Sequence, residues 1–217
     1  GLNSRDFVRK ILFNQEIKTN NAVEGINNDL LIIENVIKNN LMIGNDKKRR
    51  EIINLYNGYK YIFTNNIMDK EHLLELYKIL SDGLLSSSDM ARMGEYYRED
   101  KVYILRKGRI DMELAEGIDY SLIDRYMDIY FAYVNDNSDK TMTDEFIKSQ
   151  IMHFYFVYIH PYFDVNGRSS RTMAMWYLLK KQAYPYIIFN RGISFKGSKY
   201  DRVIKDAKEN CDITYFL

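Results

Sequence analysis

Apolar residues recur at spacings of three and four along most of the chain, which is the pattern of amphipathic helices. Four windows show one apolar face and therefore predict helices that pack on a common core, and these windows are residues 30–41, 52–63, 73–80 and 123–134. Gly44 and Gly83 follow two of them as stop signals. Only Pro161 and Pro185 interrupt the 217 residues, so we expect an all-α fold.

One segment departs from the helical pattern. The stretch KVYILRKGRI contains three β-branched or aromatic residues, Val102, Tyr103 and Ile104, and then a turn signal at Gly108. It predicts a short β-hairpin, which needs support from helices because an isolated hairpin is marginal in water. The hairpin is either an ordinary surface loop or a flap over a site.

The most informative stretch is HPYFDVNGRSSR, His160 to Arg171. Residues 146–159 before it are apolar on every side, which predicts a central buried helix. Pro161 cannot continue that helix, and the Asn-Gly pair at 166 and 167 is a strong turn signal. Helical spacing resumes over residues 168–181, so the stretch is a loop between two helices and opens the second.

Such a position suits an anion, because the first backbone N–H groups of a helix lack internal partners and carry partial positive charge. Gly167 permits close approach of a ligand, and Arg168 and Arg171 are spaced to lie on one helical face. Asp164 supplies an oxygen ligand of the kind that holds Mg²⁺ together with phosphate oxygens. These features describe a polyphosphate site with His160 at its edge as a candidate proton acceptor.

Each residue also has an ordinary explanation. A histidine at a helix end is commonly a surface or capping residue, and two arginines three apart commonly lie on a solvated face. His153, His160 and Asp164 could form a zinc site, although no further nitrogen or sulfur ligand has matching spacing. The conjunction of all these residue types at one helix junction favours the phosphate site.

Composition narrows the classes of partner. Lys and Arg number 31 against 30 Asp and Glu, so no overall basic field favours nucleic acid. Cys211 is the single cysteine, no apolar run approaches the roughly 18 residues of a membrane span, and the N-terminus is not signal-like. We therefore expect one cytoplasmic domain without nucleic-acid or membrane partners.

The stretch from His160 to Arg171 closely resembles the signature of Fic-domain proteins, His-Pro-Phe-x-Asp-Gly-Asn-Gly-Arg-x-x-Arg. A second stretch, GEYYREDKVYI at 94–104, resembles the Gly-x-Tyr-Arg segment that leads into that family's flap. The resemblance implies a single Fic domain over 1–217, all-α with a small β-hairpin flap. Its parts would be N-terminal helices over 1–45, the flap over 94–110 and a core helix–loop–helix over 146–183.

The resemblance implies transfer of AMP from ATP to a Tyr, Thr or Ser hydroxyl of a protein, the chain itself included. His160 resembles the general base, and Asp164 resembles the ligand of Mg²⁺. The residues implied to bind nucleotide are Asn166, Gly167, Arg168, Ser169, Arg171 and Tyr200. The flap residues implied to clamp the target backbone by strand addition are Val102, Tyr103, Ile104 and Leu105.

Three positions depart from the family signature. Tyr162 replaces Phe, an easy exchange if the hydroxyl finds a partner. Val165 replaces a glycine, which indicates either that this position does not need positive φ or that the loop differs. Ser170 replaces a glycine inside the helix and should be tolerated there.

The segment NNAVEGIN at 20–27 resembles the family's inhibitory motif, Ser/Thr-x-x-x-Glu-Gly/Asn. Glu24 and Gly25 match it, and Asn20 stands where Ser or Thr is expected. By this resemblance Glu24 pairs with Arg171 and takes the place of the γ-phosphate, or it positions a water that removes AMP.

Other activities stay open at this point. Some relatives transfer UMP, phosphate or phosphocholine, and an ATP-sensing or protein-binding module without turnover is the alternative of another class. The expected partners are ATP, a target protein that the sequence does not name and, in a homodimer, a second copy of the chain.

Overall fold

The computed structural model describes residues 4–39, 46–107, 112–181, 199–214 and 216. The helices within these ranges are α1 (Ser4–Val23), α2 (Leu30–Asn39), α3 (Asp46–Thr64), α4 (Lys70–Ser81), α5 (Ser87–Met90), α6 (Ile123–Asn135), α7 (Met142–Ile159), α8 (Asn166–Lys180) and α10 (Lys199–Asn210). A 3₁₀ turn, η1 (Tyr120–Leu122), precedes α6. The all-α prediction is confirmed, and each predicted helical window falls within a helix as far as it is described. Leu41, Gly44 and Pro185 lie outside the described residues.

Local sequence explains where several helices begin. Asp69 caps α4 by accepting a hydrogen bond from the backbone N–H of His72, as a short acidic side chain at the N-cap does. Thr141 and Asp144 form a reciprocal capping box at the start of α7. These caps fix the start of two helices that the periodicity alone places only approximately.

The predicted hairpin is present. Strand β1 (Tyr103–Lys107) pairs antiparallel with β2 (Met112–Glu116), with Tyr103 opposite Glu116. The hairpin therefore extends beyond residue 110, the predicted end of the flap. Gly108, the predicted turn residue, lies outside the described residues.

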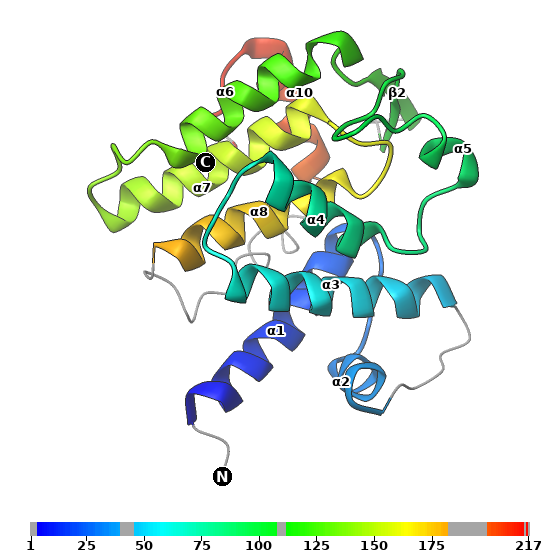
Figure 1. Cartoon of the computed structure of the whole chain (residues 1–217), viewed down its shortest axis with the longest axis vertical. Helices are drawn as coiled ribbons and strands as arrows, with labels where there is room; N and C mark the ends of the chain where they lie inside the picture. Colours follow the sequence, from blue (N-terminus) through cyan, green and yellow to red (C-terminus); the bar gives the residue numbers. More distant parts are fainter. Residues whose placement is uncertain (1–3, 40–45, 108–111, 182–198, 215, 217) are drawn as a thin grey trace.

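Helices α7 and α8 form the centre of the molecule, with α3 and α4 on one side and α6 on another (Figure 1). Apolar side chains from all of these helices meet there, including Leu55, Leu76, Tyr130, Phe156 and Trp176. Because neighbours cover α7 and α8 almost all round, neither helix shows a marked apolar face. The loop between them is thus held at both ends by the core.

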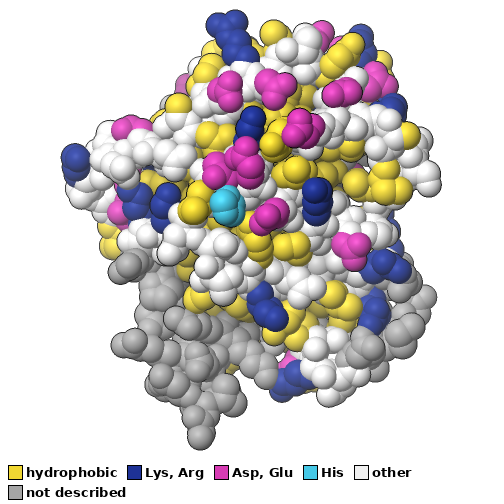
Figure 2. Space-filling view, viewed as in Figure 1, with side chains coloured by type: hydrophobic (Ala, Val, Ile, Leu, Met, Phe, Trp, Pro, Cys, Tyr) yellow, Lys and Arg dark blue, Asp and Glu magenta, His cyan; other side chains and the backbone are white. Residues whose placement is uncertain are grey.

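The surface carries mixed charge. In Figure 2, Lys and Arg side chains lie interspersed with Asp and Glu on the visible face, in keeping with a net charge of +1. Within the described ranges, no helix combines the length and apolar character needed to cross a bilayer.

Candidate active site

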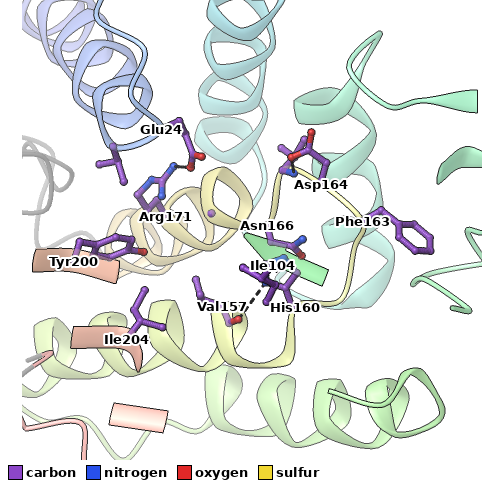
Figure 3. A pocket seen from close by; sticks show the side chains of 13 residues that line it. Glu24, Ile104, Val157, His160, Phe163, Asp164, Asn166, Arg171, Tyr200 and Ile204 are labelled. Carbon is purple, nitrogen blue, oxygen red and sulfur yellow. Dashed lines mark hydrogen bonds and ion pairs between the residues drawn. The ribbon is translucent and has the colours of Figure 1, made fainter. Parts of the chain in front are cut away.

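A pocket of about 280 Å³ opens where the loop between α7 and α8 meets the end of α1, strand β1 and helix α10 (Figure 3). Its lining residues are Val23, Glu24, Ile104, Val157, His160, Phe163, Asp164, Val165, Asn166, Gly167, Arg171, Tyr200 and Ile204. Segments far apart in the sequence therefore contribute to one site. Several predicted site residues are among them, and four further lining residues were not predicted from the sequence: Val23, Val157, Phe163 and Ile204.

His160 is the residue that ends α7. Its backbone is left-handed, with φ of 55° and ψ of 60°, and its N–H donates to the carbonyl of Phe156 at 2.9 Å. Ring atom Nδ1 lies 3.3 Å from the carbonyl oxygen of Val157. Because a carbonyl oxygen only accepts, Nδ1 is the donor in this contact, and in the neutral form of the ring the lone pair is then on Nε2. Nε2 is therefore the atom at which the neutral ring can accept a proton.

Asn166 fixes the shape of the loop. Its Oδ1 accepts from the backbone N–H of Tyr162 at 3.0 Å, and its Nδ2 donates to the carbonyl of Tyr162 at 2.8 Å. A side-chain amide thus closes a turn that backbone bonds alone would leave open. Asp164 lies between Tyr162 and Asn166 in the loop. Its side chain is exposed at the pocket, and its Oδ1 accepts a hydrogen bond from the N–H of Val165 at 2.6 Å.

Val165 corrects one expectation. Its φ is +65°, so this position keeps the left-handed backbone that a glycine provides, although a β-branched residue occupies it. Its side chain is buried in the main core, which holds the valine in this conformation. Helix α8 also continues unbroken through Ser170, whose hydroxyl donates to the carbonyl of Gly167.

Tyr162 was expected to replace Phe easily if its hydroxyl had a hydrogen-bond partner, and the structure shows no such partner among the described residues. Its ring is fully buried and stacks on Tyr77, with centroids 3.5 Å apart and planes within 5°. Its hydroxyl finds no hydrogen-bond partner among the described residues. Burial raises the pKa of this phenol well above its usual value, so it stays neutral. The exchange of Phe for Tyr therefore places an unsatisfied polar group in the core.

Arg171 lies at the inner end of the pocket and is 1% exposed. Its Nη2 donates to Glu24 Oε1 at 2.5 Å, and its Nε donates to Asn20 Oδ1 at 2.8 Å. Asn20 in turn donates from Nδ2 to the hydroxyl of Tyr59. Burial lowers the pKa of Arg171, but the charge and hydrogen bond of Glu24, together with smaller effects of Tyr200 and Tyr59, raise that pKa overall. Arg171 is thus a fixed, fully charged group.

Glu24 and Gly25 together end helix α1. Gly25 has φ of 76° and its N–H bonds the carbonyl of Ala22, while the N–H of Ile26 bonds the carbonyl of Asn21. This is a Schellman motif, which ends α1 and makes Glu24 its C-cap. Burial would raise the pKa of Glu24, but the charge and hydrogen bond of Arg171 lower it overall.

The carboxylate of Glu24 lies over the start of α8. A Cβ atom at Gly167 would come within 2.6 Å of Glu24 Oε1 and 3.0 Å of Arg171 Nη1. Glycine therefore makes room for an acidic group beside the N-terminus of α8, where the partial positive charge of a helix favours anions.

The two arginines of the motif diverge. Arg168 Nη1 lies 3.4 Å from Glu51 Oε1 on α3, with both side chains buried, and Arg168 does not line the pocket. The expectation that both guanidinium groups face one anion is therefore not met in this structure, although the backbone of residue 168 still lies in the first turn of α8. Burial raises the pKa of Glu51, which the charge of Arg168 only partly offsets. Ser169 is fully buried outside the pocket, and its hydroxyl has no partner within the described ranges.

Tyr200 closes the other end of the pocket together with Val157 and Ile204. Its hydroxyl lies 2.7 Å from Nε2 of His153, which is fully buried. Burial, with a further effect of the charge of Arg171, lowers the pKa of His153 well below its usual value. His153 therefore supports Tyr200 as a neutral ring. Across the described residues, no three His, Cys, Asp or Glu side chains are grouped to hold a metal ion, which gives the zinc alternative no support.

The flap residues alternate in direction, as strand residues do. Ile104 lines the pocket, Tyr103 is 55% exposed, and Val102 is buried just before β1. The side chain of Leu105 lies outside the described part of the chain.

Several solved structures share this fold. The structure resembles a Fic family protein from Desulfovibrio desulfuricans G20, with a TM-score of 0.77, 21% identity, and coverage of 96% of this chain and 60% of that one. It also resembles Fic-1 from C. elegans, with a TM-score of 0.71, 17% identity, and coverage of 98% and 59%. A Fic domain containing signaling protein from Bacteroides thetaiotaomicron VPI-5482 gives a TM-score of 0.75, 17% identity, and coverage of 97% and 77%.

The chain thus spans about 60% of the length of the first two of these proteins. At these identities the likeness shows the fold alone. No curated protein sequence matches the chain. The sequence itself matches the Fic/DOC family over residues 67–178, more than half of its length. The chain therefore belongs to the Fic/DOC family, whose domains are generally transferases of nucleotide or phosphate-containing groups.

Proposed function

We propose that the chain is a protein adenylyltransferase, which transfers AMP from ATP to a Tyr, Thr or Ser hydroxyl of a protein. One observation carries the proposal: His160, whose neutral ring has Nε2 as its acceptor atom, lines the same pocket as the N-terminus of α8 and the buried Arg171 in the second turn of that helix. A base and an anion site in one pocket are what phosphoryl-type transfer to a hydroxyl needs.

In the proposed reaction, Nε2 of His160 accepts the proton of the target hydroxyl. The hydroxyl oxygen bonds to the α-phosphorus of ATP, and the bond from that phosphorus to the oxygen bridging the β-phosphate breaks. Pyrophosphate leaves, and His160 afterwards gives up its proton. The N–H groups at the start of α8, beginning at Gly167, orient the phosphates, and Arg171 holds the γ-phosphate.

Asp164 fits a role in binding Mg²⁺. It is an exposed carboxylate at the pocket, beside the N-terminus where phosphates would lie, and Mg²⁺ commonly takes one or two carboxylates together with phosphate oxygens. Bound there, the ion would neutralise charge on the phosphates and on the departing pyrophosphate.

The flap supports a target of variable sequence. Within the described residues β1 pairs only with β2, so its other edge presents backbone groups that an extended target segment can pair with. Ile104 faces the pocket from that strand and would bring the target hydroxyl toward His160. The same strand edge would also accept a segment of a second copy of the chain, so that one copy could present a tyrosine to another for self-modification.

We further propose that Glu24 inhibits the reaction within the chain. Its carboxylate pairs with Arg171 beside Gly167, where the γ-phosphate of a productively bound ATP would have to lie. Asn20 supplies the hydrogen-bonding group that Ser or Thr would supply, since its Oδ1 accepts from Nε of Arg171. A second function, removal of AMP, is favoured by the partial exposure of Glu24, 36%, which lets a water reach its carboxylate.

The test uses ATP labelled at the α- or the γ-phosphate. We expect protein-bound label only from the α-phosphate, and His160→Ala should lower transfer about 10²- to 10⁴-fold, the usual effect of losing a general base. His72→Ala, on α4 away from the pocket, is the matched control and should transfer normally. Glu24→Gly should raise transfer.

The alternatives give different results. Label from the γ-phosphate would mean phosphate transfer, and labelled UTP or CDP-choline would reveal transfer of UMP or phosphocholine. ATP binding without any covalent product in the Glu24→Gly variant would indicate a sensing module. Undiminished transfer by His160→Ala would overturn the role of His160.

A further inference from the structure

Arg98 lies between the flap and the loop that carries His160, and it is 2% exposed. Its guanidinium donates to three backbone carbonyls: Nε to that of His160 at 2.9 Å, Nη1 to that of Asp100 at 2.7 Å and Nη2 to that of Ile118 at 2.6 Å. Asp100 precedes β1 and Ile118 follows β2, so one side chain joins both ends of the hairpin to the active-site loop.

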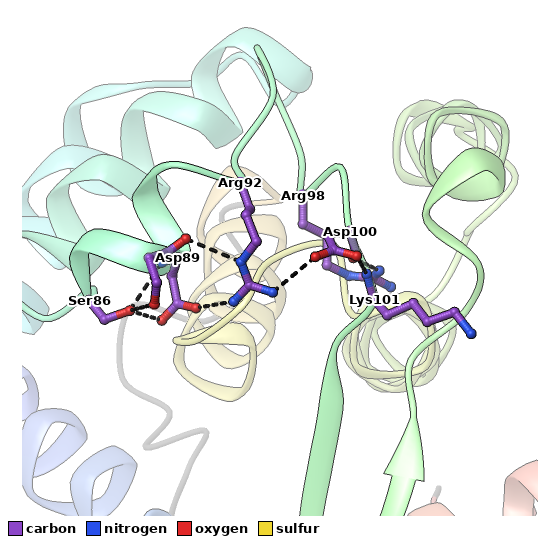
Figure 4. Close-up of polar contacts among 7 residues, drawn as sticks. Ser86, Asp89, Arg92, Arg98, Asp100 and Lys101 are labelled. Carbon is purple, nitrogen blue, oxygen red and sulfur yellow. Dashed lines mark hydrogen bonds and ion pairs between the residues drawn. The ribbon is translucent and has the colours of Figure 1, made fainter.

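This arginine differs from its exposed neighbour. In Figure 4, Arg92 bridges the carboxylates of Asp89 and Asp100, whereas Arg98 points inward from the segment before the hairpin. No carboxylate among the described residues lies within ion-pair distance of Arg98, and burial lowers its pKa. Its donors instead go to carbonyl oxygens, in charge-assisted bonds that are roughly twice as strong as neutral ones.

The contact with His160 is made where the backbone is strained. A left-handed conformation is unfavourable for a residue with a side chain, and it persists where the surroundings enforce it. Arg98 holds two successive carbonyls there, because its own backbone N–H also donates to the carbonyl of Pro161 at 3.0 Å. The direction of the His160 ring follows from this backbone.

Gly117 gives independent evidence that the guanidinium group of Arg98 is tightly packed. A Cβ atom at this position would lie 2.9 Å from Arg98 Nη2 and 2.7 Å from Val102 Cγ1. The N–H of Gly117 also bonds the carbonyl of Val102, at the base of the hairpin. Any side chain at residue 117 would therefore displace the guanidinium or open the hairpin.

We propose that Arg98 is a positioning residue that fixes the base of the flap and the backbone of His160 as one rigid unit. The inference rests on the proposed function in one respect: it assigns the rigid unit the task of keeping the target hydroxyl aligned with the base. A planar fork with separate donors is required, because the single ammonium of lysine cannot reach three carbonyls on three segments.

The test compares Arg98→Lys with Arg125→Lys, the same change at an exposed position on α6. Hydrogen exchange in Arg98→Lys should become faster in two separate segments, the paired strands β1 and β2 and residues 160–166. The chain has three histidines, so the ring signals of His160 are readily assigned by nuclear magnetic resonance with His160→Ala. Those signals should shift in Arg98→Lys, while the signals of His72 stay in place.

Kinetics provides the second readout. We expect kcat for transfer to fall roughly 10- to 100-fold in Arg98→Lys, the effect of misplacing a reacting group by about 1 Å, with KM for ATP unchanged. Gly117→Ala should change exchange, ring signals and kcat in the same directions, and Arg125→Lys should change none of them.

The outcomes separate this inference from the proposed function. If the unmodified chain transfers no AMP, the proposed function fails, and hydrogen exchange and the ring signals still test the coupling. Faster exchange in only one of the two segments, or unchanged signals of His160 in both variants, would overturn the coupling even in an active enzyme. Loss of thermal stability with an unchanged kcat would reduce Arg98 to a structural role.

Discussion

Replacing Glu24 with glutamine removes one negative charge from the pocket and keeps the shape of the side chain. In the structure, Oε1 of the Glu24 carboxylate accepts a 2.5 Å hydrogen bond from Nη2 of the buried Arg171. A hydrogen bond to a charged group contributes about 1.5–3 kcal/mol, and we take the lower end because the Glu24 side chain is 36% exposed. The free energy of unfolding should therefore fall by roughly 1–1.5 kcal/mol without ATP.

The affinity for ATP should change in the opposite direction. If the γ-phosphate must displace the Glu24 carboxylate from Arg171, ATP binding in the wild type loses the free energy of that contact. Removing about 1.4 kcal/mol of competition corresponds to a tenfold lower Kd, so Glu24→Gln should bind ATP about ten times more tightly. Isothermal titration calorimetry with ATP measures this, and chemical denaturation measures the stability.

The control is Glu71→Gln, which removes an exposed carboxylate from the first turn of α4. It should leave the Kd for ATP unchanged. A Kd in Glu24→Gln within about twofold of the wild type would contradict a competition between Glu24 and the γ-phosphate for Arg171, because a twofold change corresponds to less than 0.5 kcal/mol. Both the pairing with Arg171 and the position beside Gly167 would then be irrelevant to nucleotide binding.

The same contact gives a pH dependence of known sign. The pKa of Glu24 is lowered in the folded chain, so its contribution to stability is present above the ordinary pKa of a glutamate and is lost as the pH falls through the lowered value. The difference in Kd between wild type and Glu24→Gln should therefore persist from neutral pH down to about pH 4. A difference that vanishes already near pH 6 would contradict the lowered pKa.

Three further substitutions test the loop and the end of α1. Tyr162→Phe should raise the free energy of unfolding by about 1 kcal/mol, because the hydroxyl is buried without a partner among the described residues, and Tyr61→Phe, which loses a bond to Glu75, should not. Val165→Gly should lower it by about 1 kcal/mol, since the loss of roughly 2 kcal/mol or more of burial exceeds the relief of a left-handed valine. Gly25→Ala should lower stability by about 1 kcal/mol and tighten ATP binding, because alanine disfavours φ of 76° and loosens Glu24. Urea denaturation of each variant beside the wild type checks the three, and changes of opposite sign would contradict them.

The helices were predictable because buried positions on a helix recur every three or four residues, and these positions are apolar in the sequence. Residues 146–159 are apolar on every side, and α7 is indeed enclosed by neighbours. The second strand was not predictable in the same way. Met112–Glu116 reads MELAE, and these residues favour helices, so the pairing with β1 overrides local preference.

In the candidate site too, features made by neighbouring residues were predictable from the sequence, and contacts between distant residues were not. The candidate base His160 and the chain reversal after Pro161 follow from neighbouring residues in the sequence. The Asn-Gly pair was expected to form the turn itself, but Asn166 and Gly167 lie in the first turn of α8 and the loop ends at Val165. The pairing of Arg168 with Glu51 joins residues 117 positions apart, and no periodicity encodes which face of α8 that arginine takes. Arg98 is less predictable still, because its partners are backbone carbonyls, which every residue has.

Two left-handed residues bracket the loop, His160 with φ of 55° and Val165 with φ of 65°. Each costs about 1–2 kcal/mol relative to the right-handed form, so the loop would not take this shape in isolation. Arg98 holds the first through its carbonyl, the core holds the second through its side chain, and Asn166 closes the turn between them. These contacts are made by the chain itself. Because the strain is balanced before any ligand arrives, the binding energy of the proposed nucleotide would not be used to order the loop and would remain available for placing the phosphates.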